Sequence, residues 1–334
     1  MNYLLLRKFL FLFDPETAHG ITMWLLRCLA RINLVHYLAP PLQDDPCKIL
    51  GLNFRNRVGI AAGLDKGENI NALGQLGVGF IEVGGVTPKP QPGNPRPRIF
   101  RLLDDEGLIN RMGFNNSGVD ELVNCLKRRN YEGIVGVNIT KNKDTPLDQA
   151  GADYVLIMER VYPYVDYIAV NISSPNTPGL RELQTPAYLY NLLSGLKGVQ
   201  QRLAKQYEKY VPLVVKIAPD LTDTELTEMA TTLLDVGIDG VIATNTSLSR
   251  EGLKDPLLAK EAGGLSGKPL STKSTEIIGK LFKILQHRIP IIASGGVMSA
   301  EDAKAKRAAG AELVQVYTGL IYHGPVLLSD IANS

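Results

Sequence analysis

Eight short apolar segments, rich in β-branched residues, recur along the chain and constrain its fold more than any other feature. They lie at residues 58–62, 80–83, 134–139, 167–171, 213–217, 240–244, 290–294 and 313–317. Segments with helical spacing, such as 222–236 and 300–309, separate most of them. Strands that alternate with helices form parallel sheets, and eight of them suffice to close a barrel. We therefore predict an α/β fold, a (β/α)8 TIM barrel. An open doubly wound sheet is the alternative, but no GxGxxG opens the first unit.

The composition excludes several classes of protein. The 334 residues include 36 Lys+Arg and 34 Asp+Glu, for a net charge of +2, and 45% are hydrophobic. This is globular composition without the basic excess of nucleic-acid-binding proteins. Three cysteines without a CxxC and four histidines without ligand spacing argue against a disulfide framework or a metal site. We expect neither a nucleic-acid partner nor a metal.

Residues 1–45 differ from the rest and predict a helical unit ahead of a barrel domain at 46–334. Residues 1–13 are strongly apolar, with one basic pair at Arg7 and Lys8. Asp14 followed by Pro15 predicts the start of a second helix. No run reaches the roughly 18 apolar residues that a membrane span needs. Two interpretations stay open: a helical hairpin packed on the barrel, or an interfacial membrane anchor.

Polar residues end several of the predicted strands, and long connections follow the second, fourth and sixth strands. Both features belong to the carboxyl face of a barrel, where active sites lie. Asparagine side chains donate and accept hydrogen bonds together, which suits a ring bearing N–H and C=O groups. Lys66 and Lys216 would compensate negative charge on a reduced flavin or a carboxylate, although either lysine alone also fits a solvated rim. Gly296 after the seventh strand and the turn at 317–319 after the eighth predict a phosphate site.

Six motifs in order resemble class 2 dihydroorotate dehydrogenase, the membrane-associated family that uses a quinone. They are AGLDK at 62–66, NRMGFNN at 110–116, NISSPNT at 171–177, KIAPD at 216–220, ATNT at 243–246 and GGLSG at 263–267. The resemblance covers nearly the whole chain. It implies an FMN-dependent oxidoreductase that oxidises (S)-dihydroorotate to orotate in de novo pyrimidine (UMP) biosynthesis, with a membrane quinone reoxidising the reduced FMN.

The same resemblance implies the residues of the site. The positions that match FMN contacts are Ala62, Gly63, Lys66, Gly85, Asn138, Asn171, Lys216, Thr244, Gly267, Gly296, Tyr317 and Thr318. The positions that match contacts to dihydroorotate or orotate are Lys66, Asn110, Arg111, Met112, Gly113, Phe114, Asn171, Asn176, Asn245 and Thr246. His19 and Arg101 match positions that line the quinone tunnel.

Ser174 matches the catalytic base of the family, which removes the C5 proton of dihydroorotate. Composition and spacing alone would not select this residue, because Ser-Pro is a common turn sequence. A serine is a weak base unless a neighbour activates it, and we expect a relay through Thr177 or a water molecule. The soluble class 1 enzymes carry cysteine at this position, so the serine favours class 2.

The resemblance also favours the anchor interpretation of residues 1–45, because class 2 enzymes use such a helical pair as quinone tunnel and membrane foot. We expect peripheral association with the cytoplasmic side of a bacterial inner membrane, since no Arg- and Ser-rich transit peptide is seen. Two other functions stay open: an FMN barrel enzyme that reduces NAD or fumarate, and a non-catalytic flavin- or phosphate-binding barrel. His19 also fits a helix surface, and Arg101 also fits an ion pair with Asp104 or Asp105.

One position departs from the family pattern. Related bacterial sequences commonly read Gly-Thr-Val-Thr-Pro after the second strand, whereas this chain carries Gly85 in place of the first threonine. The missing hydroxyl removes a hydrogen bond of about 1 kcal/mol near FMN. We therefore predict weaker FMN retention than in relatives that carry the threonine.

Overall fold

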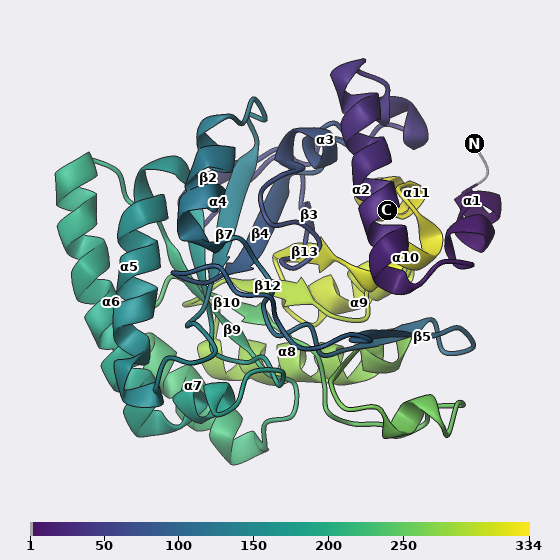
Figure 1. The fold of residues 1–334 in the computed structure, drawn as a ribbon. Helices are drawn as coiled ribbons and strands as arrows, with labels where there is room; N and C mark the ends of the chain where they lie inside the picture. The colour runs from purple at the N-terminus through teal and green to yellow at the C-terminus, as the bar shows by residue number, and fades with distance from the viewer. Residues whose placement is uncertain (1–2) are drawn as a thin grey trace.

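The computed structural model describes residues 3–334, and its centre is a closed barrel of eight parallel strands (Figure 1). The strands follow the chain order around the barrel: β3 (Val58–Ile60), β4 (Phe80–Val86), β7 (Ile134–Ile139), β8 (Tyr167–Asn171), β9 (Leu213–Ile217), β10 (Gly240–Ala243), β12 (Ile291–Ser294) and β13 (Leu313–Val316). Strand β13 pairs with β3 and closes the ring, with Val314 opposite Val58. All eight predicted strands are present, and the predicted TIM barrel is confirmed.

Helices surround the barrel on its outside. They are α3 (Ile70–Gly74), α4 (Gly118–Lys127), α5 (Ala150–Val161), α6 (Pro186–Tyr207), α7 (Asp223–Val236), α8 (Ser271–Leu285), α9 (Ala300–Ala308), α10 (Thr318–His323) and α11 (Val326–Ala332). Helix α7 shows how the local sequence sets such boundaries. Thr222 and Glu225 form a reciprocal capping box at its start, and Gly237 ends it in the left-handed conformation with φ 74°.

Aromatic side chains close the end of the barrel at which the strands begin. A hairpin of β1 (Cys47–Ile49) and β2 (Leu52–Phe54) packs against it. The ring of Phe54 meets that of Phe80 edge-on at 5.5 Å, and Phe80 in turn contacts Tyr167 at 6.5 Å. Nearer the carboxyl ends of the strands, buried polar residues replace these apolar side chains. The interior of the barrel is therefore apolar where the strands begin and polar where they end.

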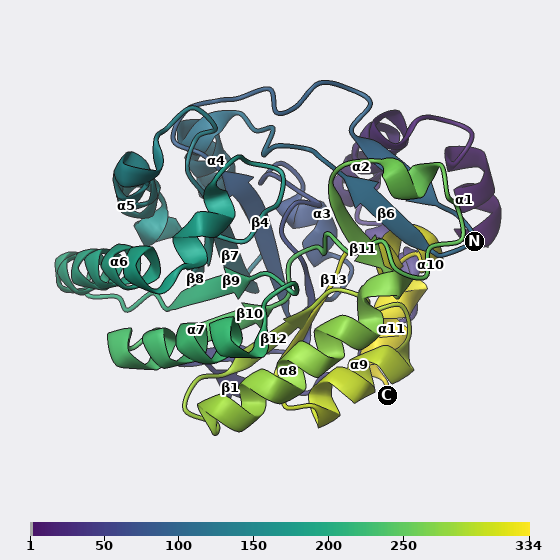
Figure 2. The same ribbon diagram turned by 90° about the horizontal axis from the view of Figure 1, so that it is seen from below.

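A three-stranded antiparallel sheet lies beside the mouth of the barrel (Figure 2). It is formed by β5 (Ile99–Leu102), β6 (Gly107–Asn110) and β11 (Gly264–Gly267), with β6 in the middle. Asn110 pairs with Gly264, 154 positions later in the chain. The sheet was not predicted, because these segments were identified only as long polar connections. It fixes the two loops that follow β4 and β10 against each other.

The N-terminal residues form helices α1 (Tyr3–Leu10) and α2 (Pro15–Arg31), followed by a 3-10 turn at Val35–Leu38. Asp14 caps α2 as predicted, and its Oδ1 accepts hydrogen bonds from the backbone N–H groups of Glu16 at 3.2 Å and Thr17 at 3.0 Å. Residues 1 and 2 of the predicted unit 1–45 lie outside the described residues. No helix between residues 3 and 334 combines the length and the apolar character needed to cross a membrane.

Specific polar contacts hold these helices on the barrel. The hydroxyl of Tyr3 donates to the carbonyl oxygen of Ile321 at 2.7 Å, and Arg7 donates to that of Tyr322 at 2.9 Å. The buried Arg98 donates to Glu16 on α2 with Nε and Nη2, at 3.1 and 2.8 Å from Oε1. Helices α1 and α2 therefore lie against α10 and the small sheet (Figure 2).

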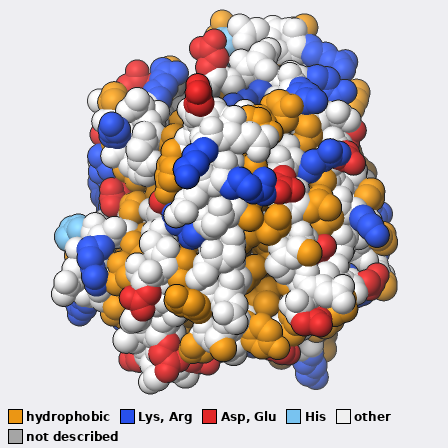
Figure 3. Space-filling view, turned by 90° about the vertical axis from the view of Figure 1, so that its left-hand side faces the viewer, with side chains coloured by type: hydrophobic (Ala, Val, Ile, Leu, Met, Phe, Trp, Pro, Cys, Tyr) orange, Lys and Arg blue, Asp and Glu red, His pale blue; other side chains and the backbone are white. Residues whose placement is uncertain are grey.

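Large apolar side chains remain exposed on this N-terminal pair. Leu5 is 65% exposed, Phe9 55%, Leu12 81% and Trp24 57%. The opposite side of the molecule, over α5 and α6, presents charged side chains of both signs with apolar ones between them (Figure 3). The helical unit thus has an uncovered apolar surface, of the kind that marks a site of interaction with a membrane or a partner.

Candidate functional site

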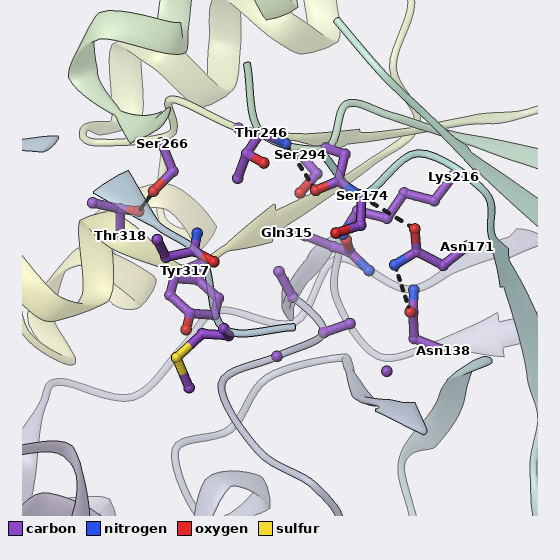
Figure 4. Close-up of a pocket in the computed structure, with 18 of the residues that line it drawn as sticks. Asn138, Asn171, Ser174, Lys216, Thr246, Ser266, Ser294, Gln315, Tyr317 and Thr318 are labelled. Carbon is purple, nitrogen blue, oxygen red and sulfur yellow. Dashed lines mark hydrogen bonds between the residues drawn. The ribbon is translucent and has the colours of Figure 1, made fainter. Parts of the chain in front are cut away.

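A cleft at the carboxyl ends of the barrel strands gathers most of the predicted site residues (Figure 4). It encloses about 1010 Å³ of empty space, part of it open to solvent. Its wall contains Ala62, Gly63, Lys66, Gly85, Asn110, Met112, Gly113, Phe114, Asn138, Asn171, Ser174, Asn176, Lys216, Thr244, Asn245, Thr246, Gly267, Gly296, Tyr317 and Thr318. Closure of the barrel therefore brings together residues from Ala62 to Thr318, which lie far apart in the sequence.

Arg111 is the one predicted substrate contact that does not line the cleft. Its guanidinium forms an ion pair with Glu261 at 2.5 Å and lies 4.5 Å from the centre of the Phe100 ring. Its side chain therefore supports the loop that follows β10, while the neighbouring Asn110 and Met112 face the cleft.

Several cleft residues were not predicted. They are Ala61, Asn115, Ser266, Leu270, Ser294, Val297 and Gln315. Ser294 and Gln315 lie on β12 and β13, and their polarity within otherwise apolar strands is the signal that would have identified them. Ser266 lies on the short strand β11, and the others belong to connections whose course is set by tertiary contacts. Gly295 and Gly319, from the glycine turns predicted to bind phosphate, also line the cleft.

Two lysines give the cleft its positive charge: Lys216 is buried, whereas Lys66 is partly exposed. Lys66 donates to the carbonyl oxygen of Gly84 at 3.0 Å, and burial lowers its pKa from 10.5 to about 8. Burial also lowers the pKa of Lys216, against an opposing effect of Glu82, and Lys216 donates no hydrogen bond to any residue between 3 and 334. A buried ammonium group without a partner is costly, so this wall favours a ligand that carries or develops negative charge.

The described wall contains no aspartate, glutamate, histidine or cysteine. Burial raises the pKa of Tyr317 to about 12, so this phenol stays protonated at neutral pH. Ser174 is buried, projects into the cleft (Figure 4), and its Oγ accepts a hydrogen bond from the N–H of Asn176 at 3.3 Å. Acid–base chemistry in this cleft is therefore restricted to hydroxyl groups, lysines and water.

A chain of asparagine side chains crosses the floor of the cleft. Asn171 Nδ2 donates to Asn138 Oδ1 at 2.9 Å (Figure 4), and Asn245 Nδ2 approaches Asn171 Oδ1 at 3.3 Å. Asn176 Nδ2 donates to Asn110 Oδ1 at 3.2 Å on the loop side. These amides form an array of donors and acceptors, as the asparagine-rich strand ends predicted.

The other end of the cleft is built for an anion. The backbone N–H groups of Gly295, Gly296, Thr318 and Gly319 donate no hydrogen bond within residues 3–334. Gly296 has a φ of 67°, and a Cβ there would lie 2.2 Å from Cα of Ser271, so any side chain at this position would collide with the start of α8. Free N–H groups in a glycine turn and at a helix start favour a phosphate group.

Lys306 lies behind this end of the cleft and is completely buried. Its Nζ donates to Ser274 Oγ at 2.6 Å, and Ser274 donates to the carbonyl oxygen of Gly295 at 2.9 Å. Burial lowers the pKa of Lys306 to about 8. The lysine thus holds the start of α8 against the glycine turn.

The space beside Gly85 is occupied by an aromatic ring. A Cβ at this position would lie 2.7 Å from Cδ1 of Phe114 and 3.3 Å from Oδ1 of Asn138. A side chain at position 85 therefore requires the ring to move. Compared with threonine, Gly85 therefore has two effects: it lacks a hydroxyl group, and it lets the Phe114 ring approach β4.

His19 and Arg101 lie outside the described cleft wall, on the side of the N-terminal helices. Although part of the His19 side chain is accessible, surrounding protein lowers its pKa, and the charges of Asp65 and Lys66 reach it. Arg101 donates to the carbonyl oxygen of Phe13 at 2.7 Å and stacks 4.3 Å from the ring centre of Phe11. It forms no ion pair with the aspartates at 104 and 105 within residues 3–334.

Comparisons with known proteins agree with this geometry. The family model described as dihydroorotate dehydrogenase matches residues 46–334. A protein of Idiomarina loihiensis named dihydroorotate dehydrogenase (quinone) is 55% identical over 332 residues, which cover 99% of each chain. One of the same name from Aeromonas salmonicida is 56% identical over 334 residues, covering 100% of this chain and 99% of the relative.

A solved structure gives the same result. The structure of DHODH from Eimeria tenella in complex with ferulenol superimposes with a TM-score of 0.87 and 39% identity, covering 96% of this chain and 90% of that one. Sequence, barrel architecture and cleft residues lead to one assignment: the chain belongs to the dihydroorotate dehydrogenase family.

Proposed function

We propose that this protein is an oxidoreductase that oxidises dihydroorotate to orotate in pyrimidine biosynthesis and delivers the electrons to a quinone. The curated relatives named dihydroorotate dehydrogenase (quinone) match it from end to end. The observation that carries the proposal is the cleft itself, where amide side chains converge with two lysines and where the described residues contribute no acidic side chain. This arrangement suits a substrate with N–H and C=O groups and a carboxylate.

The family is generally flavin-dependent, and we propose FMN as the cofactor. Three observations support the fit: unpaired N–H groups around Gly296, the unpartnered ammonium of Lys216, and the buried Oε1 of Gln315, which has no hydrogen-bond partner within residues 3–334. Ala62, Gly63, Gly85, Thr244, Gly267, Tyr317 and Thr318 would complete the cofactor wall. When bound, FMN would accept hydride from C6 of dihydroorotate and release the electrons to the quinone.

The substrate end would be formed by the loop residues and the amides. Lys66 would hold the carboxylate of dihydroorotate, while Asn110, Asn171, Asn176, Asn245 and Thr246 would match its ring donors and acceptors. The backbone from Met112 to Phe114 would cover the ring, with Gly113 in the left-handed region at φ 71°. Arg111 is omitted from this set because its side chain pairs with Glu261.

Ser174 would take the proton from C5 of the substrate. Its Oγ already accepts a hydrogen bond from Asn176, and the nearby lysines favour the developing negative charge. Because the described wall contains no carboxylate or imidazole, the proton would leave through Thr177 or water. Ser174 is itself buried, which limits the access of bulk water to its hydroxyl group.

We propose that residues 1–45 form the quinone entry and a peripheral membrane contact, and that 46–334 form the catalytic barrel. The exposed side chains of Leu5, Phe9 and Leu12 support an apolar docking surface on α1 and its turn. His19 and Arg101 would flank the quinone path. The charges of Asp65 and Lys66 near the barrel mouth reach His19 on α2, and Arg101 donates to the carbonyl oxygen of Phe13. The location proposed is the cytoplasmic side of an inner membrane.

The purified protein provides the decisive test. It should be yellow, and anaerobic addition of dihydroorotate should bleach the flavin absorption with formation of orotate. Adding a water-soluble quinone should then restore the colour, whereas NAD or fumarate should not. Failure of dihydroorotate to bleach a flavin-loaded sample would refute the substrate assignment, and reoxidation by NAD or fumarate alone would refute the quinone.

A further inference from the structure

One buried carboxylate beneath the cleft has no part in the function proposed above. Glu82 on β4 is completely buried and forms no ion pair within residues 3–334. Instead, its two oxygen atoms accept hydrogen bonds from three uncharged side chains: Asn138 Nδ2 at 2.9 Å, Tyr167 Oη at 2.9 Å and Gln315 Nε2 at 2.8 Å. A buried carboxylate is tolerated only when donors surround it in this way.

A carboxylate determines which end of a neighbouring amide faces it, because it accepts hydrogen bonds and cannot donate them. Asn138 must therefore turn its NH2 group to Glu82 and its carbonyl oxygen to Asn171, whose Nδ2 donates to it at 2.9 Å. Asn171 in turn directs its own carbonyl oxygen to Nδ2 of Asn245, 3.3 Å away. The orientation of the Asn138 amide therefore determines that of Asn171, which in turn determines that of Asn245.

The far end of this chain requires the same direction. The backbone N–H of Thr246 donates to Oδ1 of Asn245 at 2.8 Å, which leaves the NH2 group of Asn245 to face Asn171 and Ser173 Oγ. Glu82 at one end and the backbone N–H of Thr246 at the other therefore require the same orientation of the three asparagine amides. A reversed amide at any point would place two donors or two acceptors against each other.

Gln315 forms a second branch from the same carboxylate. Its Nε2 donates to Glu82, so its Oε1 must point away from Glu82. Gln315 lines the cleft (Figure 4), and its Oε1 is buried without a hydrogen-bond partner in the described chain. A buried acceptor without a donor costs free energy, which a ligand N–H or O–H would recover.

We propose that Glu82 is a positioning residue that fixes the direction of the amide side chains on two sides of the cleft. Glu82 is not part of the described cleft wall, and it acts through Asn138 and Gln315, while its charge also reaches Lys216. The consequence is a single pattern of donors and acceptors for the ligand, in place of a mixture of flipped amides. The identity of the ligand used in the test, orotate, rests on the proposed function.

The substitution Glu82→Gln tests the proposal in the holoenzyme. A glutamine presents one acceptor and one donor, so either Asn138 or Gln315 must face a donor and reverse. We expect orotate, titrated by its perturbation of the flavin absorption, to bind about tenfold more weakly, the effect of losing one or two hydrogen bonds. The matched control Tyr167→Phe removes another donor to Glu82 and one long contact, 3.5 Å from Gln315 Nε2 to the tyrosine hydroxyl, but leaves Glu82 as an acceptor for both amides. Its orotate affinity should stay within about twofold of the parent.

The double substitution Glu82→Gln with Gln315→Glu sharpens the test. It moves the carboxylate to position 315 and keeps the total charge, so the new amide at position 82 donates to it and again accepts from Asn138. Orotate affinity should recover toward that of the parent. No recovery, or an effect of Glu82→Gln no larger than that of Tyr167→Phe, overturns the proposal. A parent holoenzyme that binds no orotate at all refutes the proposed substrate instead.

Neutron diffraction from crystals of the deuterated parent protein decides the question without any substitution, and therefore also if the variants fail to fold. Deuterium on Asn138 Nδ2 facing Glu82, with a bare Gln315 Oε1 facing the cleft, supports the inference. The reverse orientation of either amide, or a proton on Glu82 donated to Asn138, overturns it.

Discussion

Proteins usually bury apolar side chains and expose charged ones, and the cleft and the N-terminal helices depart from this pattern in opposite ways. The cleft buries polar groups, including the ammonium of Lys216 and the carboxylate of Glu82, whereas the helical pair exposes apolar side chains such as Leu12 and Trp24. Each arrangement is unfavourable in water without a partner. This difference indicates that the two regions bind different partners. The cleft suits a polar, partly anionic ligand, and the helices suit an apolar phase or molecule.

The largest effect is expected in the cleft, from Ser174→Ala. Loss of the base should slow flavin reduction by dihydroorotate about 1000-fold, within the range for general base catalysis, while the protein remains yellow. Stopped-flow absorbance under anaerobic conditions measures this rate. Ser266→Ala, which alters a cleft serine bonded to Thr318, serves as the control and should change the rate only severalfold. Equal rates in Ser174→Ala and the parent would remove Ser174 from the mechanism.

The helical unit should respond to charge on its apolar surface. Leu5→Asp or Phe9→Asp should weaken binding to phospholipid vesicles about 10-fold to 100-fold each, since burying one such side chain contributes about 1.5–3 kcal/mol. Co-sedimentation with vesicles measures the binding. Leu156→Asp changes a 44% exposed leucine on α5, across the barrel, and should leave it unchanged. Similar losses for all three substitutions would show that the surface is not a membrane contact.

Lys306 tests whether burying charge behind the cleft is costly. Its pKa falls from 10.5 to about 8 on folding, so between these values the unfolded chain binds more protons and stability rises with pH. From pH 8 to pH 10, the unfolding free energy of the apoprotein should rise about 2 kcal/mol more in the parent than in Lys306→Met. Urea unfolding at several pH values measures the difference.

Lys304→Met removes an exposed lysine from the same helix and should preserve the slope of the parent. If the unfolding free energy rises with pH as steeply in Lys306→Met as in the parent, Lys306 keeps its ordinary pKa. In that case, burying an ammonium group behind the phosphate end of the cleft would cost less free energy than its lowered pKa implies.

The smallest effect is expected at Gly85. Gly85→Ala should displace the Phe114 ring and weaken orotate binding about threefold, while Gly85→Thr adds a hydroxyl that should recover FMN retention relative to Gly85→Ala. Flavin release on dilution and orotate titration measure the two effects. Identical flavin release from the alanine and threonine variants would show that the hydroxyl makes no contact with FMN.

The barrel was predictable because each strand is a compact apolar run and each pair is separated by a helical pattern. Asn138, Asn171 and Lys216 could be recognised because polar residues at the ends of buried strands interrupt that pattern. Glu82 was missed, because a single acid inside an apolar run gives no sign of whether it faces solvent or the core. Its partners come from three other strands.

The small sheet was missed for a different reason. Its strands have four residues each and include glycine and arginine, and β11 pairs with β6 although Gly264 and Asn110 are 154 positions apart in the chain. Arg111 illustrates the same limit at the level of one side chain. The motif at 110–116 gives its position in the chain, but the direction of its guanidinium depends on Glu261 in a distant loop.

The contacts of α1 also determine when during synthesis this helix can be completed. Tyr3 and Arg7 bond to Ile321 and Tyr322, so α1 can make these contacts only after the intervening 315 to 318 residues have been synthesised. At about 5–20 residues per second, that interval is roughly 16–64 s. The apolar surface of the nascent helix stays without its final neighbours throughout this time. During this interval, attachment of α1 to a membrane would therefore not compete with its contacts to α10.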